Sequence, residues 1–139
     1  MIHRVKMRGD LHKGKWNGLG GKFLPGESPE DCVVREVREE SGLRVSRPVL
    51  KGFLSFPGFD DEEDWYVFVY EARSFSGKLK PSDEGYLDWI PDRHMLKLPL
   101  WEGDRLFLGW MKGRRFFSGK LTYKKGRLKK HRVFFYPPV

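Results

Sequence analysis

The feature that constrains the fold most is one short segment that carries both a helix start and a helix stop. Ser28 can accept a hydrogen bond from the first turn, Pro29 suits the first helical position, and Asp31 can complete a capping box. Gly42 provides the residue type at which helices commonly end. The sequence therefore predicts a helix over residues 29–41.

Patterns typical of strands surround this helix. Apolar and polar residues alternate over residues 1–7, and aromatic residues are frequent in the later apolar runs. Residues 10–21 contain four glycines and predict a loop, residues 60–64 predict an acidic loop, and residues 105–112 predict a short amphipathic helix. The C-terminal part predicts a hairpin about residues 124–127. The expected strands are residues 1–7, 45–56, 65–73, 86–90, 116–123 and 128–136.

This order of elements predicts an α/β fold, in which a mixed sheet is flanked by helices, and a single domain of residues 1–139. Eleven Phe, five Trp and five Tyr are enough to bury a core, which argues against a disordered chain. No apolar run is long enough to span a membrane, and no signal peptide is visible. The single cysteine, Cys32, excludes an internal disulfide and indicates a reducing, cytoplasmic location.

Charge is divided unevenly along the chain. Residues 105–139 contain eleven Lys and Arg and no acidic residue, whereas residues 1–104 carry a net charge of −3. Crowded carboxylates repel one another, and a divalent cation is a common remedy. A basic surface on the same chain favours an anionic partner such as a nucleotide. A solvated hairpin that only aids solubility is the alternative interpretation.

Three glutamates of the predicted helix, Glu36, Glu39 and Glu40, lie at spacings that place them on one helix face. Hard carboxylate oxygens with room for water suit Mg²⁺ or Mn²⁺. Such a cation can bridge phosphate oxygens and activate a water. Taken alone, the three residues also fit an ordinary solvent-facing acidic stripe.

The residues before and within the helix form a longer pattern. From Gly21 the chain reads Gly, five residues, Glu27, seven residues, and then REVREESGL at positions 35–43. This pattern matches every fixed position of the Nudix box, so the chain resembles a Nudix hydrolase. The resemblance implies an α/β/α sandwich and metal-dependent cleavage of a nucleoside diphosphate linked to another group.

The resemblance also implies roles for individual residues. Glu27 and Arg35 would orient the glutamate face, and Lys22 would reach a phosphate. Glu36, Glu39 and Glu40 would hold the metal and supply the general base, with Glu36 slightly ahead of the other two as the base. The implied metal ligands are Gly20 through its carbonyl, Glu36, Glu39, Glu40 and, from a distant loop, Glu84; the implied catalytic residues are Glu36, Glu39, Glu40 and Arg35.

Resemblance to the MutT-like oxidised-purine nucleoside triphosphatases of this family extends beyond the box. It rests on GKWNGLGGK at positions 14–22 and on LWEGD at positions 100–104. The implied base-binding residues are Asn17, Trp101, as a ring that stacks on the base, and Asp104, while Phe56 would form an apolar wall. Trp101 fits core packing equally well. Gly103 replaces an acid of the family pattern, and this departure weakens the expected selectivity for a purine.

The N-terminal end departs from the family pattern as well. Nudix domains have a complete strand before the one predicted at residues 2–7, so the sheet is expected to lack its first strand in this chain. Either the natural product is longer, or another chain pairs with the open edge to give an oligomer.

The working hypothesis is hydrolysis of a nucleoside triphosphate to a monophosphate and pyrophosphate with Mg²⁺ or Mn²⁺. An oxidised purine nucleotide resembling 8-oxo-dGTP would be the substrate, as in nucleotide-pool sanitisation. A dinucleoside polyphosphate, a nucleotide sugar or a capped RNA is the alternative within the family. A non-catalytic nucleic-acid-binding module is the alternative outside it, because residues 124–132 are basic and lie between aromatic residues. A packing role for this hairpin is favoured over nucleic-acid binding, and no membrane partner is expected.

Overall fold

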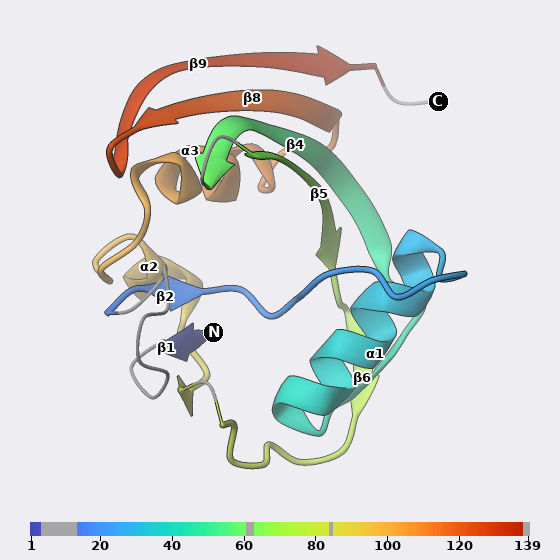
Figure 1. Cartoon of the computed structure of the whole chain (residues 1–139). Coiled ribbons are helices and arrows are strands. Elements are labelled where there is room, and N and C mark those ends of the chain that lie inside the picture. The colour runs from blue at the N-terminus through green and yellow to red at the C-terminus, as the bar shows by residue number, and fades with distance from the viewer. Residues whose placement is uncertain (4–13, 61–62, 84, 138–139) are drawn as a thin grey trace. The chain divides into compact units, whose positions relative to one another are not determined.

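The computed structural model describes residues 1–3, 14–60, 63–83 and 85–137 (Figure 1). The chain divides into two compact units. Unit 1 comprises Met1–Pro48 and Ala72–Leu100, and unit 2 comprises Val49–Glu71 and Trp101–Val139. Among the described residues, no helix combines the length and the apolar composition needed to cross a membrane.

The described part of unit 1 contains two helices and two small sheets. Strand β1 (Ile2–His3) pairs antiparallel with β2 (Trp16–Asn17) on one side and with β7 (Tyr86–Leu87) on the other. Strand β3 (Arg44–Ser46) pairs antiparallel with β6 (Ser74–Ser76). Helix α1 (Pro29–Ser41) carries the three glutamates, and the short helix α2 (Asp92–Met95) follows β7.

Helix α1 has the ends that its sequence predicts. The Ser28 hydroxyl accepts a hydrogen bond from the Asp31 backbone N–H at 3.0 Å, and the Asp31 carboxylate accepts one from the Ser28 N–H at 3.1 Å. This reciprocal pair satisfies N–H groups that the first turn leaves without helical partners. At the other end Gly42 adopts a φ of 82° and donates to the Arg38 carbonyl at 2.8 Å. Both ends are therefore confirmed.

Unit 2 is built on a four-stranded mixed sheet. Its strands are β4 (Val49–Asp60), β5 (Glu63–Glu71), β8 (Phe116–Lys124) and β9 (Arg127–Tyr136), in the spatial order β5-β4-β8-β9. Strands β4 and β8 run parallel, and the two outer pairs are antiparallel. The prediction of a mixed α/β fold with a mixed sheet is confirmed.

One face of this sheet is covered by helix α3 (Glu102–Trp110), as Figure 1 shows. Leu54, Phe117 and Leu121 are almost completely buried on this face. Burial of each such side chain contributes about 1.5–3 kcal/mol. Gly119 on β8 leaves room for the Trp110 ring of α3, because a Cβ at position 119 would collide with that ring. The apolar residues of this face therefore position α3 and the Trp101 that precedes it.

Two predicted strands differ from the observed ones. The strand predicted over residues 45–56 is wrong as a single element, because Arg47 takes a φ of 51° and separates β3 from β4. The strand predicted over residues 86–90 is limited to Tyr86–Leu87. The predicted acidic loop is only partly a loop, since Asp60 ends β4, Glu63 begins β5 and the two residues pair.

The remaining elements differ mainly at their ends. Helix α3 begins three residues before the predicted start, because Glu102, Gly103 and Asp104 carry no apolar signal of a helix face. The C-terminal hairpin is confirmed, and Lys125 and Gly126 form its turn with φ values of 51° and 77°. Sequence analysis missed β2, β6 and α2, which are too short to show periodicity. Residues 4–7 of the first predicted strand lie outside the described residues.

Candidate functional site: an acidic cluster organised by Arg35

Arg35 ties the loop before α1 to the helix. Its Nε donates to Glu27 Oε2 at 2.7 Å, and its Nη2 donates to Glu27 Oε1 at 2.9 Å. Such paired bonds from guanidinium to carboxylate are strong and fix the geometry of both groups. Nη2 also donates to the Lys22 carbonyl at 3.0 Å. The bidentate pair therefore fixes the segment that carries Lys22 against the first turns of α1.

The same guanidinium also binds two of the three predicted metal ligands. Arg35 Nη1 donates to Glu36 Oε1 at 2.7 Å and to Glu39 Oε2 at 3.1 Å. The hydrogen bond to Glu27, and after it the one to Glu36, raises the pKa of Arg35. In return, the hydrogen bond from Arg35 is the main cause that lowers the pKa of Glu27. Both groups are therefore charged at neutral pH, and one cation offsets the mutual repulsion of three carboxylates.

Glu40 faces the glycine loop. Its Oε1 accepts a hydrogen bond from the Gly20 backbone N–H at 2.8 Å, and the residue is buried. A buried carboxylate needs such a partner because desolvation without one is costly. The structure therefore places Gly20 next to Glu40, which are two of the predicted metal ligands.

Gly21 has no room for a side chain. A Cβ built on it would fall on the Glu36 carboxylate. The neighbouring Gly21 carbonyl accepts from the Cys32 Sγ at 3.7 Å, and Cys32 is buried, which raises the pKa of its thiol. The loop therefore approaches α1 closely at Glu36. Cys32, on the same helix, is a buried thiol that packs against this loop.

The solvent side of the cluster opens on a surface hollow of about 640 Å³. The Glu39 side chain is 60% exposed here, whereas that of Glu36 is only 17% exposed. Arg38 and Lys80 contribute positive charge to the hollow, and sequence analysis did not single out either of them. The hollow is lined by Glu30, Asp31, Val34, Arg35, Arg38, Glu39 and Lys80.

The remaining predicted site residues of unit 1 are Asn17, Lys22 and Glu84. Asn17 lies on β2 and pairs with Ile2. Its Nδ2 is buried and has no hydrogen-bond partner among the described residues. A buried amide donor without a partner costs about 1–3 kcal/mol. Lys22 is exposed, and Glu84 lies outside the described residues.

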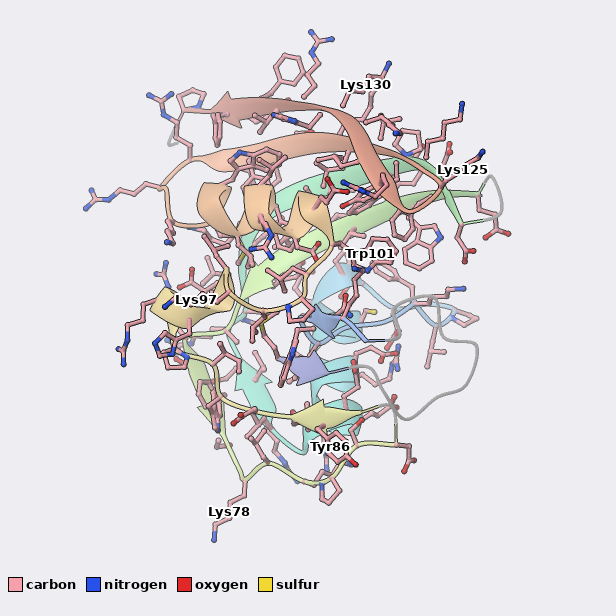
Figure 2. The ribbon with its side chains drawn as sticks, turned by 90° about the vertical axis from the view of Figure 1, so that its left-hand side faces the viewer. Lys78, Tyr86, Lys97, Trp101, Lys125 and Lys130 are labelled. Carbon is pink, nitrogen blue, oxygen red and sulfur yellow. The ribbon has the colours of Figure 1, made fainter. Side chains whose placement is uncertain are left out.

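The other predicted base-binding residues belong to unit 2. Trp101, labelled in Figure 2, precedes α3 and is only 8% exposed. The centre of its ring lies 5.2 Å from that of Phe59 and 5.6 Å from that of Tyr123. Phe56 is part of the same buried cluster. Asp104 lies in the first turn of α3, and its N–H donates to the Trp101 carbonyl at 3.0 Å. The structure thus groups these residues within unit 2, while the acidic cluster lies in unit 1.

Comparison with known proteins decides the family. The model of the NUDIX domain matches residues 1–111. The chain belongs to the Nudix family. It is 37% identical over 116 residues to an uncharacterized Nudix hydrolase of Bacillus subtilis, YvcI, which covers 80% of this chain and 73% of that protein. It is 32% identical over 120 residues to the oxidized purine nucleoside triphosphate hydrolase of Danio rerio, with 86% and 76% of the two chains covered.

A solved structure supports the same assignment for the fold. The mutator MutT protein from Bacillus halodurans matches with a TM-score of 0.79 and 33% identity, over 86% of this chain and 82% of that one. The family and these relatives identify this chain as a Nudix hydrolase, and therefore as a pyrophosphohydrolase. The resemblance inferred from residues 21–43 is confirmed.

Nudix hydrolases generally use divalent metals. The donor atoms of the acidic cluster are of the chemical type that such ions bind. Glu36, Glu39 and Glu40 offer hard carboxylate oxygens, as Mg²⁺ and Mn²⁺ prefer. Among the described residues no three His, Cys, Asp or Glu side chains form a ready-made metal cluster. Arg35 binds Glu36 and Glu39, and the Gly20 N–H binds Glu40. The assignment of metal ligands therefore stays a prediction.

The structure gives a physical reason for the departure at position 103. The Gly103 N–H donates to the Tyr123 hydroxyl at 2.6 Å. A Cβ at this position would lie 2.7 Å from that hydroxyl and 2.8 Å from a Leu121 methyl carbon. No acidic side chain fits at position 103 of this Nudix hydrolase while Tyr123 and Leu121 occupy this space.

Proposed function

We propose that this Nudix hydrolase converts a nucleoside triphosphate to a nucleoside monophosphate and pyrophosphate, with Mg²⁺ or Mn²⁺ as cofactor and an oxidised purine nucleotide such as 8-oxo-dGTP as substrate. One observation carries the proposal. The Arg35 guanidinium joins Glu27, Glu36 and Glu39 in a single network, which holds Glu36 and Glu39, two of the three carboxylates proposed for phosphate chemistry, together on α1.

The proposed ligands of the cation are Glu36, Glu39, Glu40 and the Gly20 carbonyl, with Glu84 as a fifth candidate. A bound divalent cation offsets phosphate charge and lowers the pKa of a coordinated water. One of the three carboxylates of α1 then accepts a proton from the attacking water, and Glu36 is the first candidate. Lys22 is exposed on the loop that Arg35 holds, where its ammonium can bind a phosphate.

The Asn17 side chain supports binding of a base. Nδ2 of Asn17 is a buried donor, and an acceptor on a purine would give it the partner that it lacks among the described residues. The Danio rerio relative, whose name specifies oxidized purine nucleoside triphosphates, supports the same substrate class. Trp101, Asp104 and Phe56 remain the proposed residues for contact with the base.

A second substrate class is favoured by two observations. Gly103 has no carboxylate that could form a hydrogen bond with a base. Residues 105–139 carry eleven basic residues and no acidic one. The first weakens the case for an oxidised purine, and the second suits a longer anionic substrate such as a dinucleoside polyphosphate or a capped RNA. We also propose that residues 1–139 form one Nudix domain, which the match over residues 1–111 supports, and that the enzyme is cytoplasmic.

The test is a substrate panel with Mg²⁺ or Mn²⁺ that measures release of pyrophosphate and monophosphate. The panel contains oxidised and normal purine triphosphates, a dinucleoside polyphosphate and a capped RNA. Glu39→Gln is expected to lower kcat by at least about a hundredfold, since it removes a ligand or the base. Glu63→Gln, which makes the same change on β5 outside the cluster, is the matched control. Full activity of Glu39→Gln would refute the proposed active site. Turnover of the dinucleoside polyphosphate or the capped RNA alone would refute the proposal that an oxidised purine triphosphate is the substrate.

A further inference from the structure

The sheet of unit 2 has a second face, opposite α3, on which several described aromatic side chains are exposed. Because side chains alternate along a strand, the neighbours of buried Phe117 and Leu121 point to this other side. Six aromatic residues occupy it, and three of them are more than half exposed: Tyr66 at 63%, Phe134 at 53% and Tyr136 at 54%. We call this surface the outer sheet face; its aromatic residues are Phe53, Tyr66, Phe68, Phe116, Phe134 and Tyr136.

The rings on the outer sheet face are arranged around a shallow hollow of about 420 Å³. Phe53 stacks on Tyr66 at 6.0 Å with an interplanar angle of 15°, and it meets Phe68 edge to face at 5.2 Å. The centres of the Phe116 and Tyr136 rings lie 6.1 Å apart. The hollow is lined by Phe53, Phe68, Phe116, Ser118 and Tyr136. Flat apolar rings from all four strands are therefore presented to solvent on one surface.

Basic residues continue the same face along β8 and β9. Ser118 pairs with Phe134, and the next pair on this side is Lys120 with Arg132. Thr122 with Lys130 follows. The Arg132 guanidinium lies 4.8 Å from the centre of the Phe134 ring, and Figure 2 shows Lys130 projecting from β9 on the side away from α3. The aromatic half and the basic half of the face therefore adjoin in register.

We propose that the outer sheet face binds single-stranded nucleic acid, whose bases stack on the exposed rings while Lys120, Lys130 and Arg132 contact its phosphates. Aromatic rings beside a basic track are the combination that single strands require, because every base has a stacking surface and every nucleotide has a negative charge. A duplex keeps its bases stacked on one another and cannot use the rings. The face lies wholly within unit 2 and contains none of the residues proposed for catalysis.

Charge argues against a second copy of the chain as the occupant. A twofold interface through this face would place the same basic residues of both copies close together. Like charges in that arrangement are unfavourable, and no acidic residue lies between Arg105 and the C terminus to offset them. Complementarity therefore selects a polyanion with exposed bases.

The test is fluorescence anisotropy with labelled RNA and DNA of about twelve nucleotides, as single strands and as the matching duplexes. We expect the protein to bind single strands at least about tenfold more tightly than duplexes, since only single strands stack on rings. Tyr136→Ala and Phe134→Ala should each weaken that binding about tenfold, because one stacking ring is lost. The ratio between RNA and DNA identifies the natural strand, and binding of either supports the proposal.

A matched pair of charge variants separates the face from general electrostatics. Lys120→Gln with Arg132→Gln removes two charges from the face, and Lys112→Gln with Arg114→Gln removes two from the exposed segment after α3. The first variant should lower the slope of log Kd against log salt by about 1.4, while the second should leave it nearly unchanged. Thermal unfolding by circular dichroism checks that both variants fold.

Three results would overturn the proposal. Equal binding of single strands and duplexes would show that the rings take no part. An equal loss of affinity in the two charge variants would show that the surface is not the site. A dimer in sedimentation velocity that Tyr136→Ala dissociates would show that a second copy covers the face. The outcome is independent of the proposed hydrolysis, because the assay needs no turnover.

Discussion

Replacing Gly103 by alanine tests the interpretation of why this position lacks the acid of the family pattern. The new methyl group would lie 2.7 Å from the Tyr123 hydroxyl and 2.8 Å from a Leu121 methyl carbon, so one of the two must move. Overpacking of this kind costs about 1–3 kcal/mol. Displacement of the hydroxyl also weakens its hydrogen bond with the Gly103 N–H, which adds about 1 kcal/mol. Alanine gains about 0.5–1 kcal/mol in helix propensity. A net loss of about 2 kcal/mol in the free energy of unfolding is expected.

Gly109→Ala is the matched control on the same helix. A Cβ at position 109 meets no atom within 4 Å of the described structure, so only the propensity gain applies. This variant should raise the free energy of unfolding by about 0.5 kcal/mol. The same chemical change on α3 is thus expected to have opposite signs at the two positions.

Tyr123→Phe completes a double-mutant cycle with Gly103→Ala. Alone, it leaves the buried Gly103 N–H without its acceptor, at a cost of about 1–3 kcal/mol. In the double variant the hydroxyl that collides with the alanine is absent, so the combined loss should be smaller than the sum by about 1 kcal/mol. Urea unfolding followed by circular dichroism measures all four proteins. Additive losses, or a stabilising Gly103→Ala, would refute the steric explanation.

Three further outcomes follow from the structure. Burial raises the pKa of Tyr123 to about 12, so the unfolded chain releases this proton near pH 10 while the folded protein retains it. Stability should therefore fall between about pH 10 and 12, with a smaller fall in Tyr123→Phe, as urea midpoints will show. Gly21→Ala should displace the Glu36 carboxylate and lower kcat about tenfold or more. Gly18→Ala is the control: a Cβ there meets no described atom, so its kcat should be close to that of the wild type in the same assay. Cys32 should react slowly with iodoacetamide at neutral pH until urea unfolds the chain, because burial raises the pKa of its thiol, and a fast reaction in the native protein would contradict its packed position.

How far the sequence predicts this structure depends on how local each signal is. The ends of α1 were predicted to the residue because Ser28, Asp31 and Gly42 satisfy backbone groups within the helix itself. The shared face of Glu36, Glu39 and Glu40 likewise follows from helix geometry alone. The break at Arg47 was missed because a positive φ at arginine has no sequence signature.

Contacts between distant segments were outside the reach of local patterns. The parallel pairing of β4 with β8 joins residues that are 65 positions apart, such as Gly52 and Phe117, and no periodicity indicates it. Glu27 and Arg35 were expected, from the family pattern alone, to orient the glutamate face; their mutual bond lies beyond local patterns. The bond from Gly103 to Tyr123 had no such support, so the missing acid could be noticed in the sequence but not explained.

The C-terminal hairpin shows how a choice between two interpretations can be resolved by geometry. From the sequence, packing and nucleic-acid binding appear as alternatives for the same aromatic and basic residues. In β8 the alternation divides them: Phe117 and Leu121 are buried under α3, while Phe116 and Lys120 lie on the opposite side. Because a strand presents its side chains to both faces of a sheet, one hairpin can complete a core and still offer a surface. Packing on the inner face therefore does not argue against binding on the outer one; it holds the outer rings and charges in a fixed register.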